Sequence, residues 1–255
     1  MKIAIITGAS SGMGREFIHE LDKRLNDVSE IWCISRSIDT AELPETMCKI
    51  RRIALDITKK EDIEKFKDII EAEKPGIKVL VNSAGIGRAG SVTELSYDIQ
   101  MAEIDLNCNS LFAITKICVP YMIQGGYIIN LASSAAFMPQ FNFAVYAATK
   151  SFVLSFSRGL RYELKDKKVS VTAVCPGPVD TAFFDEADKN GASFGFKKNF
   201  MAKPEKVVKK AVADAVARKQ KSVYGISMKT FDFFAKVVPH SILLNIYEAI
   251  VKKSS

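Results

Sequence analysis

Short apolar runs alternate along this chain with longer segments in which apolar residues recur at helical spacing. The runs have the length and composition of strands in a parallel sheet that is buried on both faces. Seven strands are predicted, at residues 3–6, 31–35, 50–55, 77–81, 127–132, 169–174 and 222–224. Because strand and helix alternate four times within about 85 residues, the pattern predicts an α/β doubly wound Rossmann fold, with a mostly parallel seven-stranded sheet and helices on both faces.

Helices are predicted in the segments between these strands. They are expected after the glycine-rich turn at 7–14, over 58–74, from Ser96 to Met122, from Phe143 to about Leu164, and after Lys203. Thr58 and Glu61 have the spacing of a capping box at the start of the second helix. No linker-like or repeated segment divides the chain, so residues 1–225 are interpreted as a single catalytic domain.

Residues 180–203 and 226–255 depart from this alternation. The first segment is loop-like and is the expected substrate loop, with five phenylalanines that need an apolar surface: Phe183, Phe184, Phe194, Phe196 and Phe200. The second predicts a C-terminal helical extension of two amphipathic helices joined at Pro239. We expect this extension to pack on the domain or across a homodimer interface. Contact with an anionic membrane surface is the alternative, and the small number of lysines makes it less favoured.

Composition excludes several function classes. The net charge is +7, but no clustered basic arm or nucleic-acid motif accompanies it, so no nucleic-acid partner is expected. The five cysteines are scattered without CxxC spacing, and the two histidines are far apart, so no metal site is expected. A strand-like segment from residue 2 leaves no room for a signal peptide. The pattern is typical of a reduced, cytoplasmic protein.

The glycine-rich turn after the first predicted strand has the features of a phosphate-binding site. TGASSGMG at 7–14 lies between a predicted strand and a predicted helix, where glycines let a pyrophosphate approach the backbone and helix amides meet its charge. The candidate contacts are Gly8, Ser10, Ser11, Gly12, Met13 and Gly14. Arg36 and Ser37 end the second strand, where an acid would bind a ribose 2′-hydroxyl and an arginine attracts a 2′-phosphate. The cofactor indicated is NADP(H).

Tyr146 and Lys150, in YAATK, are spaced to share one face of a helix. A nearby ammonium favours the phenolate and would lower the pKa of the tyrosine toward working pH, which suits a general acid or base. The same pair is also typical of a solvated helix surface. Its interpretation as a catalytic pair therefore depends on the motifs that precede it.

Taken together, the motifs resemble those of the short-chain dehydrogenase/reductase family over roughly residues 2–182. TGASSGMG resembles its TGxxxGxG loop, NSAG at 82–85 its NNAG segment, YAATK its YxxxK, and PGPVDT at 176–181 its PGxxxT. The resemblance implies a proton-transferring Tyr146, a Lys150 that binds the nicotinamide ribose, a carbonyl-polarising Ser133 and an Asn107 that anchors a water. It also implies cofactor contacts at Asp56, Ile57, Asn82, Ala84, Gly85, Pro176, Gly177, Val179 and Thr181.

Several functions fit this resemblance. The leading one is an NADP(H)-dependent enzyme that transfers a hydride between nicotinamide and a small-molecule carbonyl or secondary alcohol, with an apolar substrate favoured by the phenylalanines. A 3-oxoacyl-acyl-carrier-protein reductase is an alternative, because a net charge of +7 suits an acidic carrier. A non-catalytic NADP-binding regulator and a membrane-surface protein are alternatives of another class. The tail after residue 225 departs from family members that end soon after the seventh strand, which puts their usual tetramer in doubt.

Overall fold

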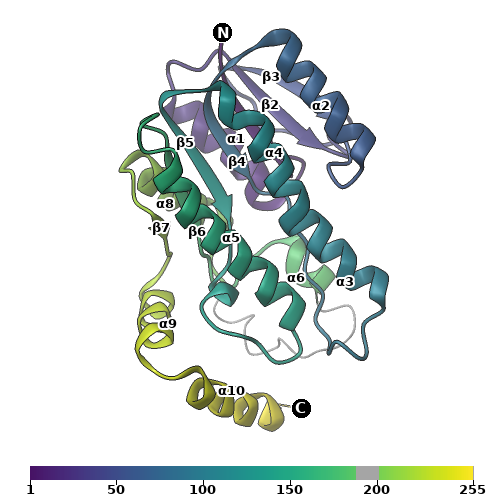
Figure 1. The fold of residues 1–255 in the computed structure, drawn as a ribbon, viewed down its shortest axis with the longest axis vertical. Helices are drawn as coiled ribbons and strands as arrows, with labels where there is room; N and C mark the ends of the chain where they lie inside the picture. Colours follow the sequence, from purple (N-terminus) through teal and green to yellow (C-terminus); the bar gives the residue numbers. More distant parts are fainter. Residues whose placement is uncertain (188–200, 255) are drawn as a thin grey trace.

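The computed structural model describes residues 1–187 and 201–254 (Figure 1). Its strands are β1 (Lys2–Thr7), β2 (Glu30–Ser35), β3 (Lys49–Ala54), β4 (Gly76–Asn82), β5 (Met122–Leu131), β6 (Ser170–Val174) and β7 (Lys221–Ser222). They form one seven-stranded sheet in the order β3-β2-β1-β4-β5-β6-β7, and every pair of neighbours is parallel. The predicted fold class is confirmed, although β5 begins at Met122 rather than at residue 127 and β7 covers 221–222 rather than 222–224.

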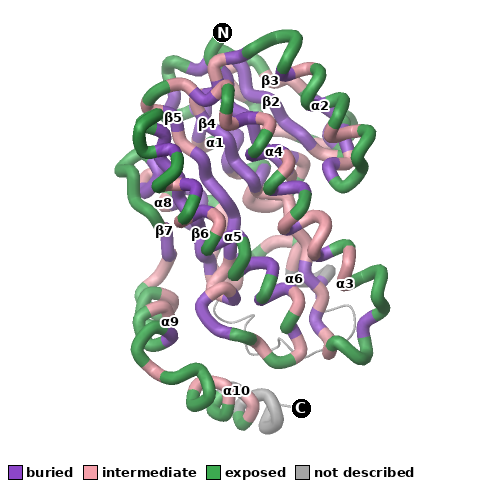
Figure 2. The backbone as a smooth tube through the Cα atoms, in the orientation of Figure 1, coloured by how far each residue is buried: buried purple, intermediate pink, exposed green. Residues whose placement is uncertain are grey.

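Helices cover both faces of the sheet (Figure 1). They are α1 (Gly12–Arg24), α2 (Lys60–Glu73), α3 (Tyr97–Ile104), α4 (Leu111–Cys118), α5 (Ala144–Glu163), α6 (Ala182–Ala187), α8 (Pro204–Val216), α9 (Ile226–Val237) and α10 (His240–Ser254). Side chains alternate across each strand, so Ile6 packs with α1 and α8 while Ile5 packs with α2 and α4. Buried residues therefore concentrate in the strands and on the inner helix faces (Figure 2).

The predicted helical region from Ser96 to Met122 is confirmed over residues 97–121, but it is not α-helical throughout. A π-helical stretch (Asp105–Ser110) separates α3 from α4, and Met122 already belongs to β5. One local prediction was wrong, because Thr58 does not cap α2. Its N–H and hydroxyl both donate to Asp56 Oδ1, and Lys59 occupies the N-cap position of the helix. The Thr58 hydroxyl therefore donates to Asp56 instead of accepting from a helix N–H, as a capping residue would.

The strand order reverses at the boundary between β1 and β4. The chain proceeds from β1 to β2 and β3 on one side, then returns to place β4 on the other side of β1. Connections that diverge from two adjacent parallel strands leave a crevice beyond their carboxyl ends, and ligands of open α/β sheets bind there. The segments that follow β1 and β4 therefore define where a site is expected.

The C-terminal extension has the two predicted helices, with Pro239 between them. In α9, Phe231 packs against Phe137 at a ring-centroid distance of 5.8 Å, and Asp232 forms an ion pair with Lys221 of β7. In Figure 1, α10 lies at the far end of the molecule from the N-terminus, and Leu243 is a residue of α10 that packs against the core. None of the described helices is long and apolar enough to cross a bilayer.

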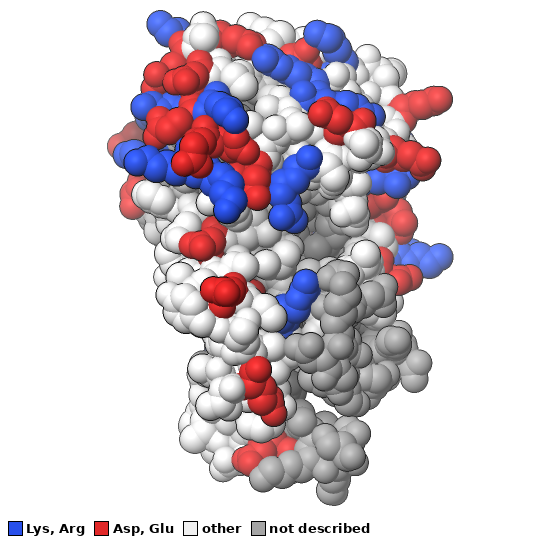
Figure 3. Space-filling model, turned by 90° about the vertical axis from the view of Figure 1, so that its right-hand side faces the viewer, with Lys and Arg blue, Asp and Glu red and all other residues white. Residues whose placement is uncertain are grey.

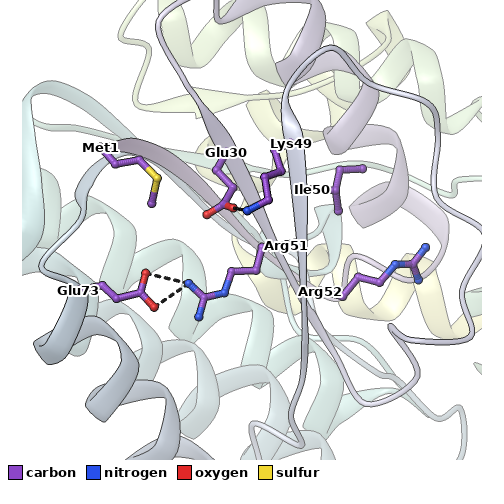
Figure 4. Close-up of a pocket in the computed structure, with 7 residues that line it drawn as sticks. All are labelled: Met1, Glu30, Lys49, Ile50, Arg51, Arg52 and Glu73. Carbon is purple, nitrogen blue, oxygen red and sulfur yellow. Dashed lines mark hydrogen bonds and ion pairs between the residues drawn. The ribbon is translucent and has the colours of Figure 1, made fainter.

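Charged side chains are mixed by sign on the face shown in Figure 3. Many form pairs along α2, where Lys65 binds Asp62 at 2.8 Å and Lys67 lies 3.7 Å from Glu64. A hollow at the amino ends of β2 and β3 is also lined by paired charges (Figure 4). There Lys49 binds Glu30 at 2.8 Å and Arg51 binds both oxygens of Glu73. It lies at the end of the sheet opposite to the crevice between β1 and β4.

Candidate active site

The glycine-rich turn after β1 packs directly on the segment after β4. Gly8 has a φ of +68°, and a Cβ there would lie 2.8 Å from the backbone N and Cα of Ala84. Thr7 Oγ1 accepts hydrogen bonds from the N–H groups of Ser83 and Ala84, at 3.2 and 3.3 Å. A side chain at position 8 would therefore separate the two segments, which is why glycine is required. The two loops line the crevice together.

Helix α1 begins against this turn. A Cβ on Gly14 would lie 2.0 Å from the carbonyl oxygen of Gly8, so the first turn of the helix touches the loop without intervening side chains. Ser11 is the N-cap residue, and Ser10 Oγ is 2.8 Å from Ser35 Oγ at the end of β2. Met13 is half-buried against the core. The free amides of the helix N-terminus thus face the crevice, where a pyrophosphate would bind.

The segment 176–181 closes the crevice from the other side. The Pro176 carbonyl accepts from the N–H of Ser134, at 2.8 Å, and the Cβ position of Gly177 meets Met228 of α9. Thr181 lies over the glycine turn, because a Cβ on Gly12 would be 3.6 Å from Thr181 Cγ2. Val179 forms a parallel β-bridge with Ala202. The predicted PG segment and the glycine turn are therefore neighbours in space.

The ends of β2 and β3 place an arginine and an aspartate together. Arg36 and Ser37 are exposed just beyond β2. Burial disfavours the charge of Asp56, but hydrogen bonds from Thr58 and the nearby Arg36 more than compensate, so the pKa of this carboxyl lies below its usual value. Ile57 is buried, and its carbonyl accepts from Ser110 at 2.7 Å. An exposed guanidinium thus stands just beyond the carboxyl end of β2, near the start of the segment that follows β3.

The side chain of Asn82, a predicted cofactor contact, forms hydrogen bonds inside the protein. Its Nδ2 donates to Thr115 Oγ1 at 2.9 Å and to Asn130 Oδ1 at 2.8 Å. Asn130 Nδ2 in turn donates to Ser157 Oγ at 2.9 Å. This buried polar chain joins β4, β5 and α5, and it fixes the sheet beside the crevice.

Tyr146, near the start of α5, is the centre of the site. Its side chain is buried and forms a hydrogen bond with Ser133, which follows β5. Ser133 Oγ also accepts from the N–H of Ala135 at 3.1 Å, whereas Ser134 bonds through its backbone to Pro176. Burial raises the pKa of Tyr146, the hydrogen bond with Ser133 lowers it, and the negative charge of Glu103 raises it further. The phenol therefore carries its proton at neutral pH.

Lys150 lies one helical turn after Tyr146 and is also buried. Its Nζ donates to the Leu131 carbonyl at 2.9 Å and stands 5.6 Å from the centre of the Tyr146 ring. Burial lowers the pKa of Lys150 to about 8. Burial raises the tyrosine pKa, and the predicted lowering of that pKa by Lys150 stays a prediction.

Asn107 lies in the π-helical stretch, which turns its side chain toward the site. Its Oδ1 accepts from the N–H of Ile86 at 2.9 Å, and its Nδ2 donates to the Ile86 carbonyl at 2.8 Å and to Thr149 Oγ1 at 3.0 Å. Its Oδ1 and Lys150 Nζ both lie close to Gly85, at 3.0 and 3.2 Å from the position of a Cβ there. A π-bulge within a helix is a frequent feature of functional sites.

The sequence reasoning did not find the aromatic surroundings of Tyr146. Phe143 stacks on its ring at a centroid distance of 4.3 Å, and Phe183 of α6 lies 5.6 Å away on a tilted plane. Phe183 was noticed, but as part of a loop, whereas residues 182–187 are helical. Phe184 falls in the same helix, and Phe194, Phe196 and Phe200 lie outside the described residues. Among the described residues, no cluster of His, Cys, Asp or Glu side chains is arranged to hold a metal ion.

Comparisons with known proteins agree with this geometry. The family model for short chain dehydrogenases matches residues 2–192. The chain belongs to the short-chain dehydrogenase family. It is an oxidoreductase that acts on CH–OH groups. A curated relative is an uncharacterized oxidoreductase of Staphylococcus epidermidis, 29% identical over 218 residues, which are 84% of this chain and 89% of that protein.

Solved structures of the family share the fold. A short-chain dehydrogenase from Sphingobium yanoikuyae in complex with NADPH superposes with a TM-score of 0.77 at 22% identity, over 93% of this chain and 95% of that one. A short chain dehydrogenase/reductase from Burkholderia phymatum in complex with NAD gives 0.75 at 19% identity, over 91% and 92%. Both forms of the nicotinamide cofactor thus occur among proteins of this family with the same fold.

Proposed function

We propose that this member of the family is an NADP(H)-dependent oxidoreductase that interconverts an apolar carbonyl compound and its secondary alcohol. The observation that carries the proposal is the convergence of Ser133, Tyr146 and Lys150 beside the crevice between β1 and β4. Ser133 follows β5, Tyr146 and Lys150 lie on α5, and the glycine turn after β1 packs on the segment after β4. A proton donor and a dinucleotide crevice in one place are what carbonyl reduction requires.

The residues at the crevice fit a dinucleotide. The close packing of Gly8 on Ala84 and of Gly14 on Gly8 leaves bare backbone where a pyrophosphate would lie. Gly12 and Thr181 would border it, and Arg36 would hold a ribose 2′-phosphate through a charge-assisted contact. Lys150 would bind the nicotinamide ribose. When bound, the nicotinamide supplies the hydride for reduction or accepts it in oxidation.

The chain's own residues would manage the proton. Tyr146 is protonated at neutral pH, so it can donate to a substrate carbonyl oxygen that is also held by Ser133. Oxidation of an alcohol needs the phenolate instead. Because burial and Glu103 raise the pKa of Tyr146, the enzyme should reduce carbonyls at neutral pH and oxidise alcohols faster as the pH rises. Phe143 and Phe183, which flank the phenol ring, favour an apolar substrate.

We also propose a domain organisation, an oligomeric state and a cellular location for the enzyme. Residues 1–225 would act as the catalytic domain and 226–255 as a helical extension of it. Exposed apolar side chains on the extension, such as Phe233 (60% exposed) and Ile246 (54%), favour coverage by a second copy in a homodimer. All five cysteines are free thiols, which suits a cytoplasmic location.

A substrate panel tests this function. Purified protein is mixed with NADPH or NADH and with aliphatic, aromatic, steroid-like and acyl-thioester ketones, and the loss of reduced nicotinamide absorbance is followed. Turnover of apolar ketones with NADPH is expected. Turnover restricted to acyl-carrier thioesters would favour the carrier-protein reductase instead, and tight NADPH binding without turnover of any compound would favour a cofactor-sensing regulator.

A further inference from the structure

Glu103 is a fully buried carboxyl group beside the site. It lies on α3, one helical turn before Asn107, with an exposed fraction of 0%. Glutamate is almost never fully buried unless a partner compensates its charge, because an ionised carboxylate loses its hydration inside a protein. Its environment therefore needs an explanation.

The two carboxyl oxygens of Glu103 are unequally satisfied. Oε1 accepts a hydrogen bond from the backbone N–H of Arg88. Oε2 is buried and has no hydrogen-bond partner within the described part of the chain. One donor is too few for a carboxylate, which binds two or more donors when it is stably ionised. Burial accordingly raises the pKa of Glu103 to about 7, although Arg88 and Lys150 act in the opposite direction.

The segment from Gly85 to Arg88 lies between Glu103 and the catalytic tyrosine and lysine. A Cβ on Gly87 would meet Tyr146 Cδ2 at 2.8 Å, and a Cβ on Gly85 would meet Lys150 Nζ at 3.2 Å. Glu103 holds one end of this segment at Arg88. Asn107, on the same helical face, holds Ile86 through both its N–H and its carbonyl. Helix α3 and its π-helical continuation therefore press the segment against Tyr146 and Lys150.

Glu103 also acts on these residues through its charge. The titratable and charged groups that interact with it are Arg88 on the segment after β4, and Tyr146 and Lys150 on α5. The negative charge of Glu103 raises the pKa of Tyr146 and that of Lys150. When Glu103 takes up a proton, both effects disappear.

We propose that Glu103 is a positioning residue of this site, which holds the Gly85–Arg88 segment against Tyr146 and Lys150 and whose negative charge raises the pH at which the tyrosine becomes a base. The proposal rests on the proposed function, since it concerns the proton that Tyr146 exchanges with the substrate. Ionised Glu103 opposes the phenolate, so it keeps Tyr146 a donor and favours carbonyl reduction. Neutral Glu103 removes that opposition.

The test is the pH dependence of alcohol oxidation in Glu103→Gln. The amide keeps the shape of the side chain and an oxygen for the Arg88 N–H, but it cannot carry the charge. The pH of half-maximal oxidation rate should fall by about half a unit or more, because a nearby negative charge is removed from the phenolate. Asp98→Asn is the control, since it removes the same charge from an exposed position on α3 and should leave the profile unchanged. A Glu103→Gln profile that coincides with that of the wild type would overturn the proposal.

A second measurement does not depend on turnover, and its decisive spectrum is that of the wild type. Wild-type protein with ¹³C-labelled glutamate is titrated through neutral pH and followed by infrared difference spectroscopy. A protonated glutamate carboxyl band that disappears as the pH rises through about 7 is expected, and it should be absent from folded Glu103→Gln. A wild-type spectrum without such a band would overturn the proposal. Because the band needs no substrate, this result stands even if no carbonyl compound is reduced.

Discussion

The contact between Gly14 and Gly8 allows a quantitative test of how the glycine turn is built. Gly14→Ala introduces a single methyl group, whose carbon would lie 2.0 Å from the Gly8 carbonyl oxygen and 2.7 Å from its carbon. Non-bonded carbon atoms do not approach a backbone oxygen closer than about 3 Å, so the loop or the helix must move by about 1 Å. Because the obstacle is backbone, no side-chain rotation relieves the overlap.

The same substitution at Gly159 provides a matched control. Gly159 is an exposed residue within α5, and a Cβ there would meet nothing within 4 Å of the described chain. Alanine is favoured over glycine within a helix by about 0.5–1 kcal/mol, so each variant should gain part of this stability from the higher helix propensity of alanine. At Gly14 the overlap adds an opposing cost of about 1–3 kcal/mol. Gly159→Ala should therefore be slightly more stable than the wild type, and Gly14→Ala less stable by about 1–2 kcal/mol.

Urea unfolding monitored by Trp32 fluorescence measures both variants, because this buried tryptophan is the only one in the sequence. NADPH titration of the folded variants should also show weaker binding for Gly14→Ala and unchanged binding for Gly159→Ala. If Gly14→Ala unfolds at the same urea concentration as Gly159→Ala, the close approach of α1 to the loop does not exist as described.

Two further changes test the cofactor preference and the tail. Arg36→Asp should weaken NADPH binding about tenfold and improve NADH binding, because a charge-assisted phosphate contact contributes about 1.5 kcal/mol. Arg24→Asp, at the far end of α1, is the control with the same charge change. Equal affinity of the wild type for both cofactors would refute the preference for NADPH. Deletion of residues 226–255 should lower the melting temperature and dissociate a homodimer in sedimentation experiments, because it removes Phe231 from Phe137 and Asp232 from Lys221. Strong co-sedimentation of the full chain with anionic liposomes, lost on truncation, would instead assign the tail to a membrane surface.

Strongly patterned features were predictable from the sequence. The strand at residues 3–6 was found because a run such as IAII fits a strand buried on both faces, and the glycine turn was found because it lies between a predicted strand and a predicted helix. Tyr146 and Lys150 were paired by helical spacing alone. These signals are local, so the sequence carries them without knowledge of the tertiary structure.

Features that depend on tertiary packing were not predictable. Apolar spacing around Asn107 looks the same in an α-helix and in a π-helical stretch, and the contacts of Asn107 with Ile86 join residues that are distant in sequence. Likewise Glu103 resembles any polar residue on an amphipathic helix until the segment at Arg88 covers it. The burial of Tyr146, which raises its pKa, is also a property of the folded chain that the helical spacing of Tyr146 and Lys150 does not reveal.

Turnover of the Tyr146→Phe variant tests the central claim most directly. The substitution removes the phenolic oxygen and keeps the ring, so the stacking on Phe143 and the contact with Phe183 remain. With a ketone that the wild type reduces, Tyr146→Phe should lose at least about a thousandfold in kcat, because general acid catalysis contributes about 10²–10⁴ and the hydrogen bond with Ser133 is lost as well. Its NADPH affinity should remain within about twofold of the wild type. Retention of most of the ketone reductase activity by Tyr146→Phe would contradict the account.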